Sequence, residues 1–182
     1  MVAYLLHMIV TMVMVSSLNG KITKGENPEV SSWASPEDQQ HFLSLLKKYP
    51  LRVMGRKSYE AMKHRLILKK DVRRIVITRH PEQYDNEAVP GQLEFTRESP
   101  EELAVRLSCE GHASMLLLGG GALNTEFFKK RLVNELYLTI EPKLFGEGAP
   151  FVLEDCPNIQ LKLQSVKRLN NQGTLLLFYH IE

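Results

Sequence analysis

Apolar residues in this chain gather in short runs rich in Val, Ile and Leu, and these runs alternate with segments whose apolar residues recur at helical spacing. Several runs are continuous rather than alternating, which is typical of strands covered on both faces of a sheet. We therefore expect strands at Met8–Val15, Leu51–Met54, Ile75–Thr78, Leu93–Thr96, Met115–Leu118, Glu135–Glu141, Ile159–Leu169 and Thr174–His180. The last two flank Asn170-Asn171-Gln172-Gly173, a turn composition that predicts a hairpin at the end of the chain.

Helix-start signals lie between the expected strands. Ser35-Pro36-Glu37-Asp38 combines an N-cap serine, a proline at the first position and an acidic residue at the third, and Ser99-Pro100-Glu101-Glu102 repeats this pattern. We expect helices after both signals, the second ending near Gly111. A third helix should follow Gly55, and a fourth should run from about Ala122 to Arg131. The apolar face of the third is expected to carry Tyr59, Met62 and Leu66.

The alternation of strands and helices predicts the fold class. Helices that connect successive strands produce a largely parallel sheet with helices on both faces, and the final hairpin makes that sheet mixed. The expected architecture is therefore a three-layer α/β/α fold with a mostly parallel sheet and a C-terminal antiparallel hairpin. No internal repeat, low-complexity stretch or linker interrupts the 182 residues, so we expect a single domain over residues 1–182.

Composition excludes several classes of protein. A net charge of only +2 argues against binding to nucleic acid through phosphate neutralisation. The apolar segment Met1–Val15 has no Lys or Arg before Lys21 and is too short for a membrane span, so we interpret it as a buried strand rather than a secretory signal. Cys109 and Cys156 form no CxxC motif and have no metal-ligand neighbours, which favours a reduced, cytoplasmic location and no metal site.

The sharpest local signal is Met115-Leu116-Leu117-Leu118-Gly119-Gly120-Gly121-Ala122, a buried strand that ends in three glycines before a helix. Glycines let a phosphate approach the backbone, and a helix N-terminus offers free N–H groups to an anion. A tight strand–helix turn is the structural alternative, but three glycines are more than such a turn needs. The spacing is not GxGxxG, so this is not the Rossmann fingerprint.

Two other expected strands end in polar and cationic residues. Gly55, Arg56, Lys57 and Ser58 follow one strand, and the cations at this helix start oppose the helix dipole, a conflict that a bound phosphate would offset. Thr78 and Arg79 follow another strand. Ligands of open α/β sheets gather at the carboxyl ends of the strands, so these segments predict one dinucleotide laid across that edge.

Asp38 is the carboxylate that stands out. Phe42, Leu45 and Leu46 lie four, seven and eight residues after it, so it shares the apolar face of its helix. A carboxylate that faces inward must find a partner or keep its proton. The structural alternative is a capping box in which Asp38 returns to the backbone of Ser35. We favour a functional role, because a cap does not require the apolar face.

Taken together, these segments resemble the dihydrofolate reductase superfamily over nearly the whole chain. Ser16-Ser17-Leu18-Asn19-Gly20-Lys21-Ile22 is similar to the mobile loop that closes over the nicotinamide. Trp33, Asp38 and Phe42 match the family's Trp, substrate-binding carboxylate and aromatic residue in spacing. Gly55-Arg56-Lys57-Ser58-Tyr59-Glu60 resembles its Gly-Arg-x-Thr-Trp-Glu segment, and Gly119–Gly121 its pyrophosphate glycines, where the family has a cis Gly–Gly peptide. Leu136-Tyr137-Leu138-Thr139 resembles the strand whose threonine supports the carboxylate.

One branch of the superfamily is more similar than the others. Ser17–Ile22 and the segment from Leu132 to Gly148 resemble the C-terminal reductase domain of the riboflavin-biosynthesis deaminase/reductase, which reduces the ribose of a phosphoribosylamino-pyrimidine with NADPH. Two features depart from that branch: its Val-Glu-Gly-Gly segment reads Leu118-Gly119-Gly120-Gly121 here, and its zinc deaminase half has no counterpart in this chain.

The resemblance implies an NADPH-dependent oxidoreductase of the 5-amino-6-(5-phosphoribosylamino)uracil reductase type, acting on a pyrimidine- or pterin-linked small molecule, with a homodimer as its assembly. The implied catalytic residues are Asp38 and Thr139. The implied substrate-binding residues are Val15, Ser16, Ile22, Trp33, Asp38 and Phe42. The implied cofactor-binding residues are Ser17, Asn19, Gly20, Gly55, Arg56, Lys57, Ser58, Thr78, Arg79, Gly119, Gly120, Gly121, Ala122 and Leu123.

Two alternatives stay open on the sequence. A dihydrofolate reductase is favoured by the Trp33, Asp38 and Phe42 spacing. It is disfavoured because the position of the arginine that binds the folate glutamate tail is Val72, with Arg73 one residue away. A non-catalytic dinucleotide-binding protein is the other alternative, and the retained Asp38 argues against it. The sequence leaves the natural substrate open, and also which of Lys21, Lys24 or Arg65 would hold a substrate phosphate.

Overall fold

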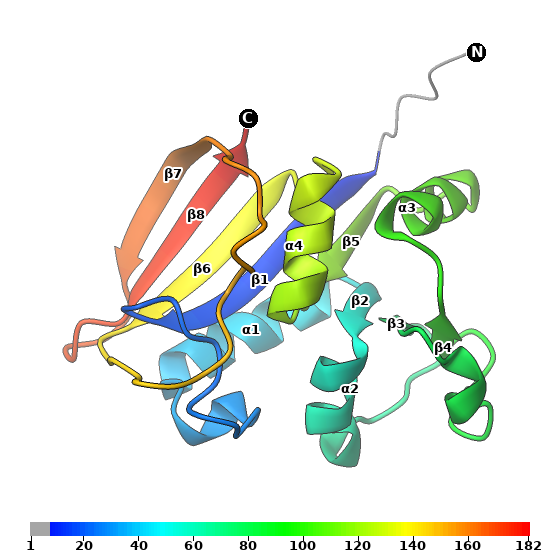
Figure 1. Ribbon diagram of the computed structural model, residues 1–182, viewed down its shortest axis with the longest axis horizontal. Helices are drawn as coiled ribbons and strands as arrows, with labels where there is room; N and C mark the ends of the chain where they lie inside the picture. Colours follow the sequence, from blue (N-terminus) through cyan, green and yellow to red (C-terminus); the bar gives the residue numbers. More distant parts are fainter. Residues whose placement is uncertain (1–7) are drawn as a thin grey trace.

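The computed structural model describes residues 8–182 and contains one eight-stranded sheet (Figure 1). The strands are β1 (Ile9–Ser17), β2 (Leu51–Gly55), β3 (Arg73–Ile77), β4 (Leu93–Thr96), β5 (Ser114–Leu117), β6 (Glu135–Glu141), β7 (Leu161–Arg168) and β8 (Leu175–Ile181). Their order is β4-β3-β2-β5-β1-β6-β8-β7, and β1 pairs in parallel with β5 on one side and β6 on the other. The first six strands are parallel, whereas β8 pairs antiparallel with both β6 and β7. The expected mixed α/β fold with a C-terminal hairpin is confirmed.

Helices cover both faces of the sheet: α1 (Pro36–Lys48), α2 (Arg56–Met62), α3 (Pro100–Cys109) and α4 (Gly121–Lys129), with 3-10 turns at Val30–Ser32, Lys63–Arg65 and Pro81–Tyr84. Figure 1 shows α3 and α4 in front of the sheet and α1 behind it. Neighbouring residues of a strand therefore enter different cores, because side chains alternate across a sheet. On β1, Met12 packs with α3 and α4, whereas Val13 packs with α1. This explains why the strands read as continuous apolar runs.

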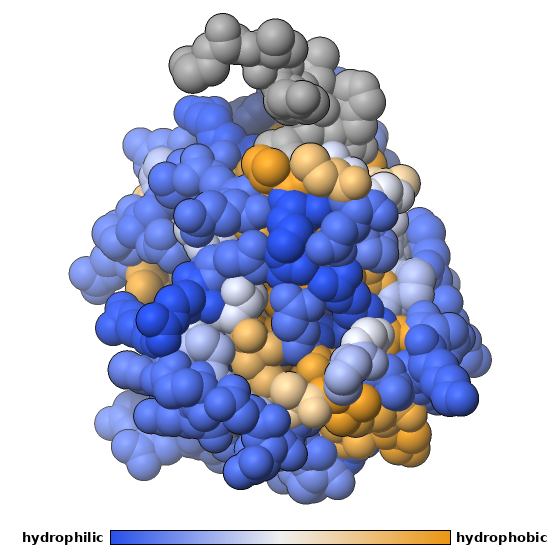
Figure 2. All heavy atoms as spheres, turned by 90° about the vertical axis from the view of Figure 1, so that its right-hand side faces the viewer, coloured by the Kyte–Doolittle hydropathy of each residue, from blue (hydrophilic) through white to orange (hydrophobic). Residues whose placement is uncertain are grey.

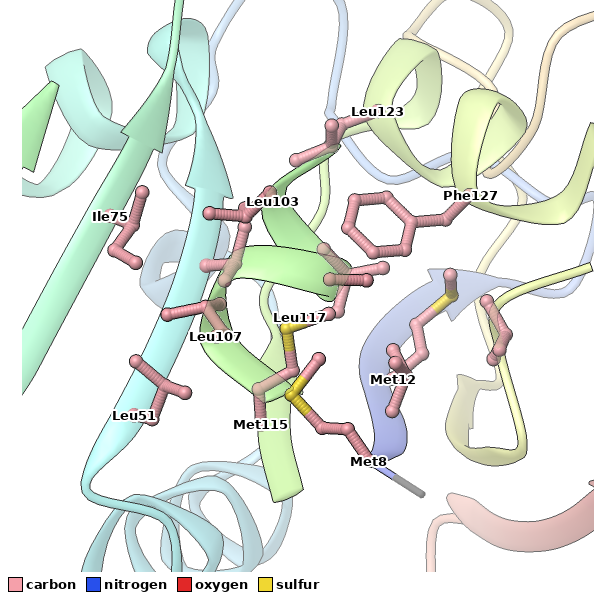
Figure 3. Close-up of a cluster of buried hydrophobic side chains, with 14 of the residues drawn as sticks. Met8, Met12, Leu51, Ile75, Leu103, Leu107, Met115, Leu117, Leu123 and Phe127 are labelled. Carbon is pink, nitrogen blue, oxygen red and sulfur yellow. The ribbon is translucent and has the colours of Figure 1, made fainter. Parts of the chain in front are cut away.

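The larger core lies under α3 and α4. Leu103, Leu107 and Phe127 reach from these helices toward Met12 and Leu117 of the central strands, and Figure 3 shows the side chains filling the space between them. All five are fully buried. Burying a side chain of this size contributes about 1.5–3 kcal/mol, so this core holds the central strands in place.

The structure corrects several expected boundaries. β1 runs two residues past Val15 to Ser17, and α4 starts at Gly121 rather than Ala122. The third helix is shorter than its apolar pattern indicates, because α2 ends at Met62 and continues only as a 3-10 turn. Leu66 nevertheless packs in the same cluster as Tyr59 and Met62. Residues 1–7 of the apolar N-terminal segment lie outside the described part of the chain.

The loop after β1 is joined to the segment between β6 and β7. The backbone N–H groups of Leu18, Ile22 and Gly25 donate to carbonyls of residues 143, 149 and 147 at 2.8, 2.8 and 3.0 Å. Gly148 permits this approach, because a Cβ there would lie 2.1 Å from the carbonyl oxygen of Thr23. The two segments therefore form one rim at the carboxyl ends of β1 and β6. No helix within residues 8–182 is long and apolar enough to span a membrane.

Candidate functional site

A cleft of about 760 Å³ opens at the carboxyl ends of β2 and β3 and the N-termini of α2 and α4. Its volume is in the range of small-molecule and cofactor sites. The structure brings ten of the predicted cofactor residues together in its lining: Gly55, Arg56, Lys57, Ser58, Thr78, Arg79, Gly120, Gly121, Ala122 and Leu123. Figure 2 faces the side of the molecule that carries α2, α3 and β4, and this surface is mostly hydrophilic.

The triple glycine forms the turn between β5 and α4. The Gly119–Gly120 peptide is cis, as the resemblance implies, and Gly119 has φ +75°. The turn is tied to the one after β2: the Gly120 N–H donates to Ser58 Oγ at 3.0 Å, and the Gly55 N–H donates to the Gly119 carbonyl at 2.9 Å. The two βα turns are therefore one hydrogen-bonded unit, and the α4 N-terminus faces the cleft beside it.

The three glycines are required for different reasons. A Cβ on Gly119 would lie 2.7 Å from Met14 Sδ, and one on Gly121 would lie 2.3 Å from the Pro150 carbonyl oxygen. The flexible Met14 side chain could move, so at Gly119 the positive φ is what favours glycine, whereas at Gly121 the Pro150 backbone demands it. A Cβ on Gly120 would meet only Ser58 Oγ, at 3.4 Å, so the fold leaves room for it. Gly120 is the position where a bound phosphate, rather than the fold, would require glycine.

Sequence reasoning missed four residues that line the cleft: Ile77, His80, Arg97 and Glu126. Arg79 lies two residues after the end of β3, and Arg97 lies directly after the end of β4. A cation just past a strand end was the signal for Arg79, and the same signal was present for Arg97. Arg97 donates to Glu82 at 2.9 Å, and its side chain is 68% exposed. The cleft therefore has exposed cations at the ends of two neighbouring strands, in addition to Arg56 and Lys57.

The second part of the site surrounds Asp38 in the first turn of α1. Asp38 is 6% exposed, and burial raises the pKa of its carboxyl from 3.8 to about 6. This value already includes the effect of Thr139, which lowers the pKa, and of the negative charge of Glu141, which raises it. The effect of Thr139 has the direction that the predicted contact with Asp38 would produce, and with a pKa of about 6 Asp38 can exchange a proton near neutral pH.

The capping-box alternative for Asp38 is wrong. In α3 the complete box forms, since Ser99 Oγ accepts from the Glu102 N–H and Glu102 accepts from the Ser99 N–H at 2.8 Å. In α1, Ser35 Oγ accepts from the Asp38 N–H at 3.3 Å, but the Ser35 N–H donates to Glu141 Oε1 at 2.7 Å. Glu141 occupies the place that the helix's own acidic residue takes in α3, and the Asp38 carboxyl is left for other contacts.

The other predicted substrate-binding residues are buried or half-buried, and three of the apolar ones pack in two clusters. Trp33 packs edge-on against Phe145 at 5.1 Å between ring centroids and shares a cluster with Val15. Phe42 packs in a second cluster with Leu45 and Tyr137. Ser16 and Ile22 are also buried. Trp33 Nε1 is buried and has no hydrogen-bond partner within residues 8–182, so it is a donor free for a ligand.

The other predicted cofactor residues lie at the end of β1. Ser17 Oγ donates to Asn19 Oδ1 at 2.8 Å, and Asn19 Nδ2 donates to the Phe145 carbonyl at 2.7 Å. Gly20 has φ +76°, a backbone conformation that residues other than glycine rarely adopt. These three residues hold the rim segment in shape and are absent from the lining of the cleft. Their contact with a cofactor stays a prediction.

The arginines at the start of β3 are committed elsewhere. Arg73 donates to Glu94 at 2.7 Å and also contacts Glu110. Arg74, on the opposite face of the strand, is buried and donates to the Ile67 carbonyl at 2.9 Å. Val72 is buried and non-polar. The described residues around the start of β3 therefore present no free arginine in the manner that a folate tail requires.

We expect the substitution Asp38→Asn to stabilise the fold at alkaline pH. Because the pKa of Asp38 is raised in the folded protein, ionisation costs stability as pH rises through about 6, and the cost vanishes below 3.8. The variant should gain about 1–3 kcal/mol in free energy of unfolding at about pH 8 and nothing at about pH 4. Urea denaturation at both pH values measures this. The exposed Asp85→Asn is the control and should change neither value. A variant less stable than the parent at both pH values would contradict the expectation.

Known proteins are similar to this chain in sequence and in fold. The family model described as "RibD C-terminal domain" matches residues 6–175. The uncharacterized protein YyaP of Bacillus subtilis (strain 168) is 25% identical over 177 residues, which cover 90% of each chain.

Two solved structures share the fold. The diaminohydroxyphosphoribosylaminopyrimidine deaminase/5-amino-6-(5-phosphoribosylamino)uracil reductase of Thermotoga maritima superposes with a TM-score of 0.75 at 18% identity, covering 96% of this chain and 57% of that one. A dihydrofolate reductase from Enterococcus faecalis complexed with NADP(H) superposes with a TM-score of 0.66 at 19% identity, covering 96% of both chains. The fold is therefore shared with a dihydrofolate reductase, and since the family model spans nearly the whole sequence, this chain belongs to the RibD C-terminal domain family.

Proposed function

We propose that this protein is an NADPH-dependent reductase that transfers hydride to a pyrimidine- or pterin-linked substrate, closest in type to 5-amino-6-(5-phosphoribosylamino)uracil reductase. The observation that carries this is Asp38. Its buried carboxyl, whose pKa is raised to about 6, lies beside β6 at the same sheet edge as the glycine-lined cleft. A protonatable group at the same sheet edge as a dinucleotide-sized cleft suits a hydride-transfer enzyme.

The residues of the cleft suit a dinucleotide phosphate cofactor. The α4 N-terminus and Gly120 would bind the pyrophosphate, and Arg79 and Arg97 would bind a 2′-phosphate. When bound, NADPH supplies a hydride from its nicotinamide ring. The chain's own residues then orient the substrate: Asp38 binds ring N–H groups or gives a proton to the nitrogen of the reduced C=N bond. Trp33 and Phe42 exclude water from the reaction.

Dihydrofolate reduction is the second candidate. The fold shared with the Enterococcus dihydrofolate reductase and the Trp33, Asp38 and Phe42 spacing favour it. The absence of an arginine at Val72 argues against it, because a glutamate tail binds best to a bidentate guanidinium, and Arg73 is held by Glu94 and Glu110. The name of the Thermotoga relative supports the phosphoribosylamino-pyrimidine instead.

The homodimer and the cytoplasmic location stay predictions that follow from the resemblance. The outer strand β7 offers a place for the first, since Leu163 and Val166 are 51% and 57% exposed. Uncovered edge strands pair readily with other chains. Absence of nucleic-acid binding is likewise an expectation from the low net charge.

Preference for NADPH over NADH should depend on the two arginines at the strand ends. The double substitution Arg79→Ala and Arg97→Ala removes the charges available to a 2′-phosphate, and each such contact is worth about 1.5–3 kcal/mol. We expect Kd for NADPH to rise about tenfold or more while Kd for NADH stays unchanged, as measured by quenching of Trp33 fluorescence. Lys162→Ala, on exposed β7, is the control. Equal affinity of the parent for both cofactors would contradict the prediction.

Gly120→Ala should abolish dinucleotide binding in a protein that stays folded. The fold itself leaves space for this methyl group, 3.4 Å from Ser58 Oγ, so it would intrude mainly on a phosphate. Gly146→Ala, where nothing lies within 4 Å of the added methyl group, is the matched control. Calorimetric titration with NADPH, with circular dichroism to confirm folding, gives the answer. Undiminished binding by Gly120→Ala would mean that the glycines only shape the turn.

The function itself is tested by NADPH oxidation with the deaminated phosphoribosylaminopyrimidine and dihydrofolate in parallel. We expect turnover of the pyrimidine and a fall of about 10²-fold in kcat for Asp38→Asn, with Kd for NADPH unchanged. Robust turnover of dihydrofolate alone would make the protein a divergent dihydrofolate reductase. Dinucleotide binding without turnover of either substrate would favour the non-catalytic alternative.

A further inference from the structure

Glu141 is a buried carboxylate to which neither the sequence analysis nor the proposed chemistry assigns a role. It ends β6 with 2% of its surface exposed, and no Lys, Arg or His nitrogen of residues 8–182 lies within salt-bridge distance of it. A buried carboxylate without a cation is costly unless hydrogen bonds satisfy it. Two donors do so: the Ser35 N–H at 2.7 Å to Oε1, and Thr174 Oγ1 at 2.9 Å to Oε2.

These two donors come from distant parts of the chain. Ser35 is the N-cap of α1, and Thr174 lies between the final hairpin turn and β8. The turn is tied in as well, because Asn170 Nδ2 donates to Thr174 Oγ1 and to Glu37 Oε2, both at 3.0 Å. The Glu141 carboxylate therefore links the start of α1 to the sheet. The bond from Asn170 of the hairpin turn to Glu37 is a second link to the same end of α1.

The fastened turn of helix is the one that carries Asp38. Glu141 accepts a hydrogen bond from the Ser35 N–H, and the Ser35 side chain in turn accepts one from the Asp38 N–H. Glu141 therefore positions the Asp38 backbone through Ser35. Thr139, which lowers the pKa of Asp38, lies two residues before Glu141 on the same face of β6. Asp38 is thus positioned by two side chains of one strand, one directly and one through the helix N-cap.

We propose that Glu141 is a positioning residue for the reaction: it fixes the Asp38 carboxyl at the sheet edge and keeps a second negative charge beside it. The inference rests on the proposed function of Asp38. A negative neighbour favours the protonated form of a carboxyl, and this is the direction in which Glu141 acts on the pKa of Asp38, after the larger effect of burial.

Other charged groups around the start of α1 act elsewhere. On α1, Glu37 bonds Asn170, and the pKa of His41 is lowered by burial and by Lys167 of β7. Lys143, just after β6, donates to the Trp33 carbonyl. Among these groups Glu141 is the one whose charge acts on Asp38.

Glu141→Gln separates charge from position. The glutamine keeps the size of the side chain, and its oxygen can still accept from the Ser35 N–H. Its amide can donate to Thr174 Oγ1 only if the threonine hydroxyl, which now donates to Glu141, turns its hydrogen elsewhere. The charge is therefore removed while the bond to the α1 N-cap is kept. We expect the pKa of Asp38, followed by carbon NMR of labelled carboxyls in the free protein, to fall by about half a unit or more. The pH midpoint of kcat should fall equally. KM and Kd for NADPH should stay within about twofold of the parent.

Glu141→Ala removes charge and anchor together. It should lower the pKa of Asp38 in the same way, and also raise KM and reduce kcat about tenfold or more at its own optimum, where Glu141→Gln retains most activity. Glu37→Gln is the matched control, because it removes the charge of a half-buried carboxylate of the same network, and it should leave the pKa of Asp38 and the pH profile unchanged.

An unchanged Asp38 pKa in Glu141→Gln, or equal kcat and KM in Glu141→Ala and the parent, would overturn the inference and leave Glu141 as a fold anchor only. The NMR measurement needs no substrate. If the parent reduces neither candidate substrate, the proposed function fails, while the shift of the Asp38 pKa still shows whether Glu141 acts on that carboxyl.

Discussion

Parallel pairing of β1 with β5 on one side and β6 on the other governs where every site residue lies. Parallel strands deliver their carboxyl ends to one edge of the sheet, and the loops and helix N-termini that follow them meet there. The triple glycine after β5, the rim segment after β1 and the Thr139–Glu141 pair at the end of β6 are neighbours for this reason. The two halves of the candidate site depend on this arrangement, because β1 separates the strand that bears the glycines from the strand that supports Asp38.

The glycine turn shows how closely the fold and the proposed chemistry are linked. Gly119 is favoured by its positive φ and Gly121 is demanded by the Pro150 carbonyl, so the turn would need them even without a ligand. Pro150 belongs to the segment that also pairs with the loop after β1. Contacts at a few glycines therefore couple the positions of the cleft, the rim and the central strand. A shift of one of these three parts would displace the others.

The start of α1 accepts an electrostatic cost. Two carboxyl groups, Asp38 and Glu141, are nearly fully buried next to each other, an arrangement that favours the protonated form of one of them. The hydrogen bonds from Ser35 and Thr174 are directed to Glu141, and the pKa of Asp38 is the one that is raised, to about 6. Sites of this kind trade stability for a perturbed pKa, and such a trade is typical of catalytic groups.

The sequence by itself determined the strands, the helix starts, the mixed sheet and the strand ends that carry glycines and cations, because these depend on local periodicity, caps and turn residues. Asp38 was also recognisable, since it interrupts an apolar helix face. Only the tertiary structure decided that Glu141 displaces Asp38 from the capping box, that Arg97 joins Arg79 in the cleft, and that α2 stops at Met62 although its apolar pattern continues. Each of these depends on contacts between residues far apart in the chain, such as the 106 positions that separate Ser35 from Glu141. Local pattern carries no information about such partners, whereas burial and hydrogen bonding across the sheet select them.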